Sequence, residues 1–347
     1  MKNQVKEPSP DMIMQVGTGF WASKILLTAV HFELFSHLSQ QGSMSANAIK
    51  STLKLNCTDR HLFDFLDALT SFGFLNRTGL LENAQYSNSM DTDTFLDKNK
   101  PLYIGGFLEM MNNRLYGSWG NLGEALITGK AQNETSKGEK TIFETLYEDS
   151  GLLKEFTNAM TGRQVGNFMV LAQNFDFSKY NNFLDVGGSA GMLSLMVAKH
   201  NLHMQCNTFD LPPIESIANE TIKKFKLDDR VRAISGDFFK EEFPKADVVA
   251  MGNILHDWNE ESKIKLIQKA YDALPEGGAF IVIEALIDND RKENAFGMMM
   301  SLNMLIETSD GFDYTFNDFN RWTGKIGFKS TTILPLSGPS SAAIAYK

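Results

Sequence analysis

The nine residues FLDVGGSAG, from Phe183 to Gly191, constrain the fold of this chain more than any other segment. An apolar run ends in Asp185 and is followed at once by Gly187, Gly188 and Gly191. This order is typical of a strand that leads into a glycine turn and then a helix, where a nucleotide-like ligand lies against bare backbone. We therefore expect a ligand site at this turn.

Beyond Tyr180, strand patterns and helix patterns alternate along the chain. The predicted strands lie within NNFLDVGG, MQCNTFD, VRAISGD, ADVVAMGNIL and AFIVIEAL, and the predicted helices span 191–200, 214–225 and 260–273. This alternation specifies a parallel sheet with helices on both faces. Two further apolar strands, KSTTILPL and SAAIAYK, close the chain. Residues 179–347 are therefore predicted to form an α/β, Rossmann-like domain.

Residues 1–100 are predicted to form a separate, mostly α domain. From Asp11 to Leu38, apolar residues recur at helical intervals on more than one side, which indicates one long or broken helix with two packing partners. We expect one of these partners to be a second subunit. The segment 43–89 has the pattern of a winged helix, in which a second helix ends at Gly73 and two strands join around Thr78 and Gly79.

Charge and composition argue against nucleic-acid and membrane partners. The 347-residue chain has a net charge of −9 and no basic patch that would attract phosphate. The second winged-helix helix is expected to expose Asp59, Asp64 and Asp67, which also disfavours DNA binding. Because charged residues and glycines interrupt the apolar stretch near the start, and no signal-peptide core precedes it, we expect a cytoplasmic protein. The two cysteines, Cys57 and Cys206, have no metal-ligand spacing.

Residues 101–178 are predicted to form a helical connector that contributes to a substrate pocket. This segment is rich in methionine, phenylalanine and glycine, and a polar loop is expected from Gly129 to Lys140.

Polar and aromatic residues follow the predicted strands at the edge where open parallel sheets bind ligands. Asp210 ends the second strand and is placed to accept hydrogen bonds from two ribose hydroxyls. Gly236 and Asp237 follow the third strand, and Asp237 is expected to accept a hydrogen bond from an adenine amine. We expect Phe238 and Trp258 to sandwich the adenine ring.

A nicotinamide dinucleotide is the nearest alternative ligand, because its site also combines a glycine turn with a downstream acid. The spacing here is Asp-x-Gly-x-x-x-Gly rather than GxGxxG, and Asp185 at the strand end would repel a pyrophosphate. Asp185 is expected instead to lie close to a cationic part of the ligand. A sulfonium compound with an adenosine tail, S-adenosylmethionine, fits these residues better.

At these motifs the chain resembles the class I S-adenosylmethionine-dependent O-methyltransferases of the plant caffeate type and the bacterial polyketide or phenazine type. The resemblance covers nearly the whole chain, and it is carried by DVGGSAG, TFDLP, GDFF, ILHDW, ALPEGG and GFDYTFNDF in this order. It implies an N-terminal winged-helix dimerisation domain, a class I methyltransferase domain, a homodimer and a small aromatic acceptor.

The resemblance also implies roles for individual residues. The cofactor positions for methionine and ribose match Asp185, Gly187 and Asp210, and those for adenine match Asp237, Phe238 and Trp258. His256 matches the catalytic base, and Glu284 and Asp313 match two acids that flank it. Met160 and Met304 match positions that grip a flat aromatic acceptor, although plain core packing is the alternative for both.

A histidine suits the chemistry that this family performs. A phenol has a pKa of about 10, so a base with a pKa near 6.5 accelerates its methylation by about 10²-fold to 10⁴-fold at neutral pH. The structural alternative for His256 is a polar residue that caps the helix beginning near Trp258. We expect Asp257 to be an N-terminal residue of that helix rather than a catalyst.

Three positions depart from the family pattern. Ser189 replaces the third glycine of the turn and is tolerated if its backbone angles are ordinary; Gly252 replaces a lysine or arginine that contacts the cofactor; and Asp313 replaces a longer glutamate. No metal is expected, because the metal-dependent catechol methyltransferases are shorter and carry an Asp-Asp-Asn cluster.

Two other functions remain open from the sequence. One is an enzyme of the same fold that uses the cofactor for N-methylation, hydroxylation or decarboxylation. The other is a winged-helix sensor of S-adenosylmethionine without catalysis.

Overall fold

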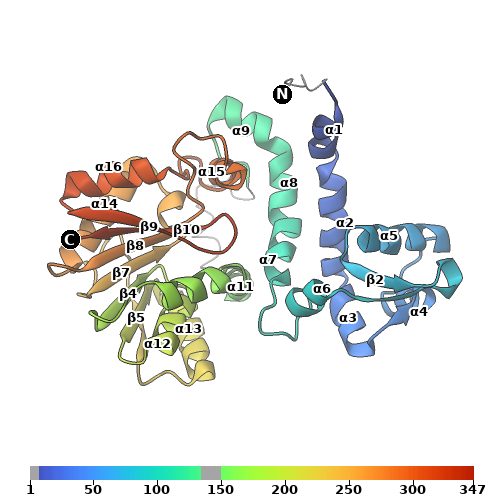
Figure 1. Cartoon of the computed structure of the whole chain (residues 1–347), viewed down its shortest axis with the longest axis horizontal. Coiled ribbons are helices and arrows are strands. Elements are labelled where there is room, and N and C mark those ends of the chain that lie inside the picture. The colour runs from blue at the N-terminus through green and yellow to red at the C-terminus, as the bar shows by residue number, and fades with distance from the viewer. Residues whose placement is uncertain (1–7, 134–149) are drawn as a thin grey trace, which may run out of the picture. The chain divides into compact units, whose positions relative to one another are not determined.

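The computed structural model of this chain describes residues 8–133 and 150–347, and Figure 1 shows their helices and strands. The chain divides into two compact units, residues 1–113 and residues 114–347. The first unit is mainly helical and the second is built on a central, mostly parallel sheet. The predicted fold class is therefore confirmed.

The first unit begins with a broken helix. A left-handed residue, Glu33 with φ +52°, separates the helices on either side of it, and Thr18 forms an earlier break. Its elements are α1 (Asp11–Gly17), α2 (Gly19–His31), α3 (Leu34–Gln41), β1 (Met44–Ser45), α4 (Ala46–Thr52), α5 (Asp59–Ser71), β2 (Leu75–Thr78), a 3-10 turn (Leu81–Asn83), β3 (Gln85–Asn88), α6 (Met90–Phe95) and α7 (Gly105–Met110).

The winged-helix pattern is present in this unit. Ser45 and Thr58 cap α4 and α5 through their hydroxyl oxygens, and β1, β3 and β2 form a three-stranded antiparallel sheet. Asp67 is only partly exposed, unlike Asp59 and Asp64. Its Oδ1 accepts a hydrogen bond from the Tyr86 hydroxyl at 2.8 Å and lies 2.6 Å from the guanidinium of Arg77, so it fixes α5 to the sheet.

The stretch Asp11–His31 is the one candidate membrane span found in the part of the chain that the structure describes. It qualifies by length and composition, because an 18-residue window within it has a mean hydropathy of 1.2, and 17% of that window is buried. The expectation of no membrane partner stays a prediction.

The second unit opens with helical segments and continues as the predicted alternation. The helical segments that precede the sheet are a π-helical turn (Met111–Leu115) across the unit boundary, α8 (Tyr116–Ser118), a 3-10 turn (Trp119–Asn121), α9 (Leu122–Thr128) and α11 (Ser150–Asn174). The strands are β4 (Asn182–Val186), β5 (Gln205–Asp210), β6 (Val231–Ser235), β7 (Val248–Gly252), β8 (Ala279–Glu284), β9 (Ser330–Pro335) and β10 (Ser341–Tyr346). Residues 134–140 of the predicted polar loop lie outside the described residues.

The seven strands form one sheet in the order β6-β5-β4-β7-β8-β10-β9. The strands from β4 to β8 are parallel, and β10 runs antiparallel between β8 and β9. Strand order reverses between β4 and β7, so the carboxyl ends of these two strands are where such a sheet binds a ligand.

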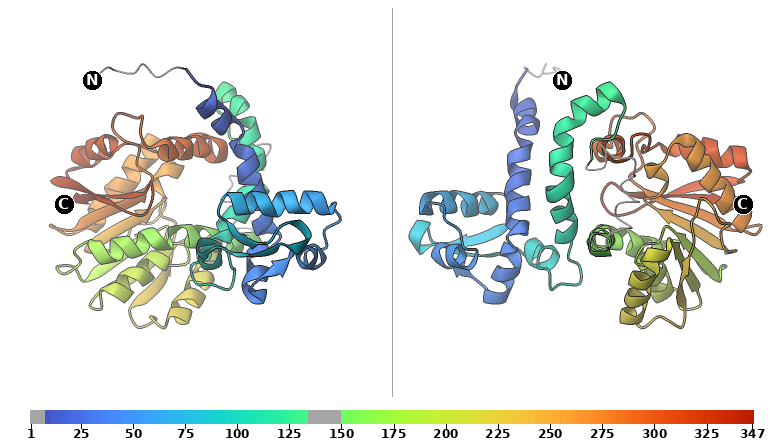
Figure 2. Two further views of the ribbon diagram at one scale, coloured as in Figure 1. Left: turned by 45° about the vertical axis from the view of Figure 1, so that its right-hand side comes forward. Right: turned by 180° about the vertical axis from the view of Figure 1, so that it is seen from behind.

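Helices cover both faces of this sheet, as Figures 1 and 2 show. The helices that follow β4 in the chain are α12 (Met192–His200), α13 (Pro212–Phe225), α14 (Glu260–Ala273), α15 (Ala295–Thr308) and α16 (Phe316–Ile326). One core joins α11, α12 and α13 to one face of the sheet, and a second core joins α14 and α16 to the other. Successive side chains of β4 enter opposite cores, since Phe183 belongs to the first and Leu184 to the second.

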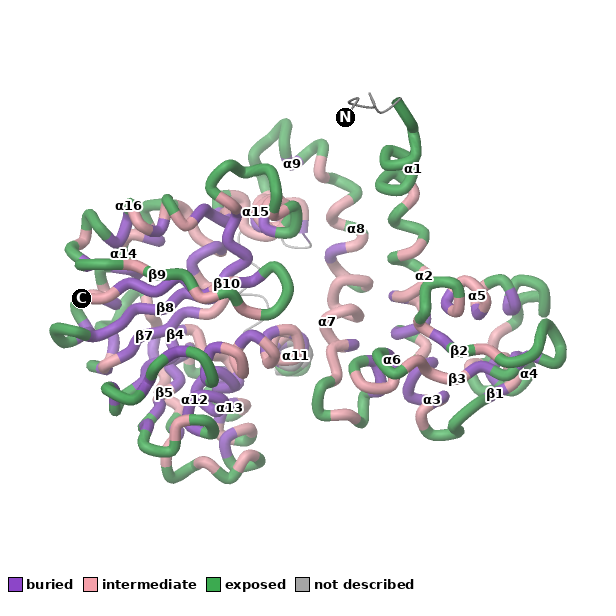
Figure 3. The backbone as a smooth tube through the Cα atoms, in the orientation of Figure 1, coloured by how far each residue is buried: buried purple, intermediate pink, exposed green. Residues whose placement is uncertain are grey.

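Burial follows the position of each strand in the sheet (Figure 3). All residues of β8 are buried, whereas β9 alternates between exposed and intermediate residues because it is an edge strand. The two strands predicted at KSTTILPL and SAAIAYK are present as β9 and β10.

Candidate active site

The glycine turn after β4 lies against a buried carboxyl group. Oδ2 of Asp185 has no hydrogen-bond partner among the described residues. A Cβ atom on Gly188 would lie 2.5 Å from this oxygen and 2.2 Å from Oγ1 of Thr208, so a side chain there would displace both groups. Burial, and next the charge of Asp210, raises the pKa of Asp185 to about 8. A cationic group from a ligand would restore the charged form of this acid.

Asp210 ends β5 and is fixed by the backbone of two turns. Its Oδ2 accepts a hydrogen bond from the N–H of Ser189 at 2.8 Å, and its Oδ1 accepts one from the N–H of Leu211 at 2.7 Å. A carboxylate oxygen accepts hydrogen bonds, so Asp210 has the chemistry that a ribose hydroxyl requires of a partner.

The backbone of Ser189 is not ordinary. Its φ angle is +50°, in the left-handed region that glycine adopts without cost. The expectation of ordinary angles is therefore wrong, and this serine holds a conformation that its side chain disfavours. Gly187 and Gly191, on either side, also have positive φ angles, and Gly191 caps the start of α12.

The turn after β6 contains Gly236, Asp237 and Phe238, as predicted. The carboxylate of Asp237 is already engaged by its own turn, because Oδ1 accepts from the N–H of Phe239 at 2.9 Å and Oδ2 lies 2.9 Å from Nζ of Lys240. Burial alone would raise the pKa of Asp237, but Lys240 and the backbone N–H of Phe239 lower it. This acid is therefore charged and available only as a hydrogen-bond acceptor.

Phe238 and Trp258 do not form the expected sandwich. Their rings are 6.1 Å apart between centroids and stand at 83°, so they meet edge to face. A ring held between two aromatic side chains needs them parallel and farther apart. Phe239, to which the sequence assigned no role, lies closer to Trp258, with ring centroids 4.6 Å apart at an angle of 86°. The three rings form one aromatic corner beside the Asp237 turn.

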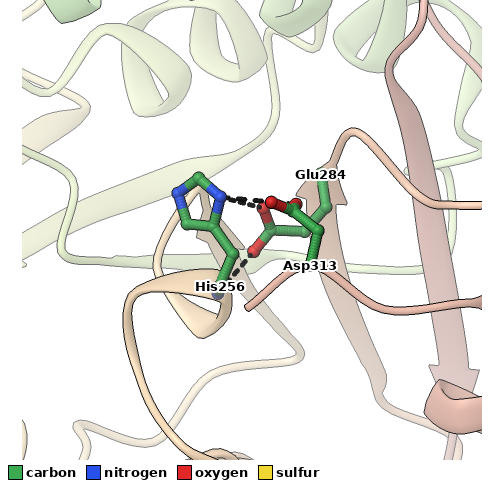
Figure 4. A group of neighbouring side chains, drawn as sticks. All are labelled: His256, Glu284 and Asp313. Atoms are coloured by element: carbon green, nitrogen blue, oxygen red, sulfur yellow. Dashed lines mark hydrogen bonds and ion pairs between the residues drawn. The ribbon is translucent and has the colours of Figure 1, made fainter. Parts of the chain in front are cut away.

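A second group of ionisable side chains, the His256 cluster, consists of His256, Asp257, Glu284 and Asp313. Nδ1 of His256 lies 3.5 Å from Oε2 of Glu284 and 3.4 Å from Oδ1 of Asp313, and Figure 4 shows both acids on that side of the ring. The backbone N–H of His256 donates to Oε1 of Glu284 at 3.3 Å. His256 is 4% exposed, and both of these acids are buried. The structure therefore brings together the three residues predicted from different motifs.

The order of elements explains this convergence. His256 lies in a 3-10 turn (Leu255–Asp257) after β7, and Glu284 is the last residue of the neighbouring strand β8. Asp313 lies in the loop between α15 and α16. Its backbone N–H donates a hydrogen bond to Oγ of Ser301 at 3.2 Å. The shorter side chain of Asp313 thus reaches the imidazole.

The charges of the cluster favour a protonated imidazole. Burial by itself lowers the pKa of His256, but Glu284, Asp313 and Asp257 outweigh it and raise that pKa to about 10. Burial raises the pKa of Glu284 to about 7 and that of Asp257 to about 6. The three carboxylates around one ring therefore raise the pKa of His256 above the ordinary histidine value of about 6.5.

Asp257 differs from its predicted place. The residue that caps α14 is Asn259, whose Oδ1 accepts from the N–H of Ser262 at 3.0 Å. Asp257 instead lies with its Oδ1 3.5 Å from Nε2 of His256. The expectation of a helix N-terminal residue is wrong, and proximity to His256 in sequence was the only signal for this contact.

Three further positions singled out from the sequence are Met160, Met304 and Gly252. Met160 lies half-buried on α11, and Met304 is buried on α15. Their contact with an acceptor stays a prediction. Gly252 ends β7, and a Cβ atom there would lie 3.3 Å from the ring of Phe168, so this aromatic side chain occupies the space beside the missing basic residue.

His256, Glu284 and Asp313 also offer one nitrogen and two oxygen atoms within 4.8 Å of one another, a spacing that is compatible with a metal ion. A proton on Nδ1 would compete with such an ion. The expectation of no metal stays a prediction.

Comparison with known proteins decides the family. A model of the O-methyltransferase domain matches residues 119–329, and a model of the O-methyltransferase dimerisation domain matches residues 14–98. The chain belongs to the O-methyltransferase family. The predicted family, fold and enzyme class are thereby confirmed, and so is S-adenosylmethionine as the cofactor of such enzymes.

Three proteins that are similar to this O-methyltransferase differ in the activities that their names give. It is 34% identical to the tetracenomycin polyketide synthesis 8-O-methyl transferase of Streptomyces glaucescens, over 97% of each chain. It is 30% identical to an N,N-dimethyltransferase of Streptomyces rimosus, over 80% of this chain and 78% of that one. It shares the fold of human N-acetylserotonin methyltransferase, solved in complex with S-adenosylmethionine, with a TM-score of 0.89, 24% identity and coverage of 100% and 99%.

Proposed function

We propose that this enzyme transfers the methyl group of S-adenosylmethionine to a hydroxyl of a small aromatic or polycyclic metabolite, with His256 receiving the proton of that hydroxyl. The observation that carries the proposal is the position of His256 at the carboxyl end of β7, with Nδ1 between Glu284 and Asp313. The polyketide O-methyltransferase relative supports the acceptor class.

The residues after β4, β5 and β6 fit the cofactor. The unpartnered Oδ2 of Asp185 suits its cationic amino acid part, the bare backbone at Gly187 and Gly188 allows close approach, and Asp210 suits the ribose hydroxyls. Asp237 and the aromatic corner at Phe238 and Trp258 suit the adenine. When bound, the sulfonium supplies an already activated methyl group, so the protein needs only to align the acceptor and accept a proton.

The His256 cluster is suited to accept that proton. Its carboxylates stabilise the imidazolium form on the Nδ1 side, while Nε2 points away from Glu284 and Asp313 (Figure 4). A phenol has a pKa of about 10, so transfer to an imidazole of similar basicity is nearly balanced in free energy. The rate of methyl transfer should therefore rise with pH at values well above the pKa of an ordinary histidine.

The proposal is tested with S-adenosylmethionine carrying a labelled methyl group and a panel of hydroxylated naphthalenes and anthraquinones. We expect label in an O-methylated product from the wild type, and a loss of kcat/KM of roughly 10²-fold to 10⁴-fold for His256→Gln. The exposed His200, at the end of α12, provides a control, and His200→Gln should be unaffected. Unchanged turnover of His256→Gln would refute the role of this residue.

Two further readouts separate the remaining alternatives. The N,N-dimethyltransferase relative favours amine methylation as the second candidate, and amine analogues of each phenol in the same assay would reveal it. Activity that survives a chelator supports the prediction that no metal takes part, whereas loss restored by an added divalent ion would refute it.

The homodimer belongs to the proposal as well. The family model of a dimerisation domain covers residues 14–98, and α1 and α2 expose large apolar side chains, namely Met12, Ile13, Val16, Phe20 and Trp21. Such a patch is typical of a subunit interface. Val16→Asp should shift the mass in sedimentation equilibrium from a dimer toward a monomer, and an unchanged mass would contradict an interface there.

A further inference from the structure

Lys263 is a buried cation beside the His256 cluster. It lies on the first turn of α14 and is 0% exposed, although lysine side chains almost never lose all contact with water. A buried ammonium must be matched by acceptors or counter-charges, because its transfer out of water is costly. The proposed catalytic scheme does not use this residue.

Two contacts fix the ammonium in place. Nζ donates a hydrogen bond to the backbone carbonyl oxygen of Trp258, which follows the His256 turn. Nζ also lies 3.5 Å from the centroid of the Phe312 ring, in the segment that carries Asp313. The ring of Tyr314 is 5.8 Å away. Lys263 therefore joins the segment after β7 to the loop that supplies the second flanking acid.

The charges around His256 come from every element packed against it. The anions are Asp257 in the same turn, Glu284 on β8 and Asp313 in the loop before α16, and Tyr314 contributes a buried hydroxyl. The cations are Lys263 on α14, which interacts with all three acids and with Asp310, and Arg163 on α11, which interacts with Asp313 and Glu284. Burial lowers the pKa of Lys263 to about 8, and these carboxylates oppose that effect.

We propose that Lys263 is a positioning residue for methyl transfer: its ammonium holds the Trp258 carbonyl and offsets the carboxylates, so that less negative charge acts on the His256 ring. This inference rests on the proposed role of His256. Nothing in the sequence distinguishes Lys263 from the other lysines of α14, of which Lys265 is exposed and Lys269 is partly covered.

Two substitutions separate charge from hydrogen bonding. Lys263→Met keeps the length of the side chain but removes the charge and the donor. Lys263→Gln removes the charge and keeps an N–H donor for the Trp258 carbonyl. Lys265 on the same helix is exposed and pairs with Glu261 at 2.6 Å, so Lys265→Met is a matched control for charge removal away from the cluster.

The test is an NMR titration of the histidine Cε1–H groups in 13C-histidine-labelled protein between pH 6 and 10.5, with the His256 signal assigned by its loss in His256→Gln. Near pH 10, where wild-type His256 titrates, Lys263 with its pKa of about 8 has already lost its charge, so the variants are compared in a Glu284→Gln, Asp313→Asn background, in which His256 titrates at lower pH. Loss of the Lys263 charge in this background should raise the pKa of His256 by about one unit in both variants. Lys265→Met should leave it unchanged.

A His256 pKa within 0.2 unit of that of the background protein, in a folded protein that also carries Lys263→Met or Lys263→Gln, would overturn the inference. The NMR result needs no acceptor. A wild type that transfers no methyl group would refute the proposed function while the titration still decides the role of Lys263.

Discussion

Two groups of buried acids lie at the same edge of the sheet, and they are balanced in different ways. The β4–β5 pair, Asp185 and Asp210, contains an acid whose Oδ2 has no hydrogen-bond partner in the described ranges 8–133 and 150–347. The His256 cluster holds more acids, but an imidazole lies within 3.5 Å of each of them. The first group is incomplete without an outside cation, whereas the second carries its own.

The difference shows what each group is suited to do. An acid that burial holds near its protonated form gains most when a cationic ligand arrives, because the ligand restores its charge. The carboxylates around His256 instead stabilise a proton on its imidazole. The β4–β5 pair is therefore suited to binding the cofactor and the His256 cluster to moving the acceptor's proton.

The largest expected effect separates binding from turnover. Asp185→Ala removes the acid that meets the cationic part of the cofactor, and loss of such a buried charge partner weakens binding by roughly 10²-fold to 10³-fold. Calorimetry with S-adenosylhomocysteine measures this loss. The same titration of His256→Gln should give a Kd close to that of the wild type. Equal affinities of the wild type and Asp185→Ala for S-adenosylhomocysteine would contradict the role of Asp185 in cofactor binding.

The next effect concerns the sign of a pKa change. Glu284→Gln removes one of the negative charges that raise the pKa of His256, so the acidic limb of kcat/KM should move to lower pH by about one unit or more. A pH profile recorded at saturating cofactor checks this shift. An upward shift in Glu284→Gln would contradict the electrostatic description of the cluster.

A third effect is the pH dependence of stability. The pKa of Asp185 is raised to about 8 in the folded protein, so its contribution to stability is present below its ordinary pKa and is lost as pH rises through 8. Thermal unfolding should therefore show the wild-type Tm falling by at least about 3 °C relative to Asp185→Asn between pH 5.5 and pH 8.5. S-adenosylhomocysteine should remove this difference, and parallel Tm curves without ligand would count against the raised pKa.

The sequence predicted the strand ends better than the contacts between them. Asp185, Asp210, His256 and Glu284 follow hydrophobic runs, and parallel strands bring such ends to one edge. The contact of Asp257 with the imidazole, and the edge-to-face packing of Phe238 on Trp258, depend on side-chain directions in irregular turns.

The directions of side chains in irregular turns have no periodic signal in the sequence. The burial of Lys263 could not be predicted either, because a lysine on an amphipathic helix is expected at the surface. The site residues could thus be placed from sequence, but the balance of charge that sets their chemistry could not.

The smallest expected effect tests the backbone of the β4–β5 pair. Ser189 has a φ angle of +50°, and its N–H donates to Asp210 at 2.8 Å. Ser189→Gly keeps that donor and relieves about 1 kcal/mol of left-handed strain, but the greater freedom of glycine in the unfolded chain offsets about 0.5 kcal/mol or more. Chemical denaturation should therefore show a gain of no more than about 0.5 kcal/mol in the free energy of unfolding. Ser189→Ala, which retains the strain and the donor, is the control, and a Ser189→Gly protein less stable than that control would show that the turn does not strain this residue.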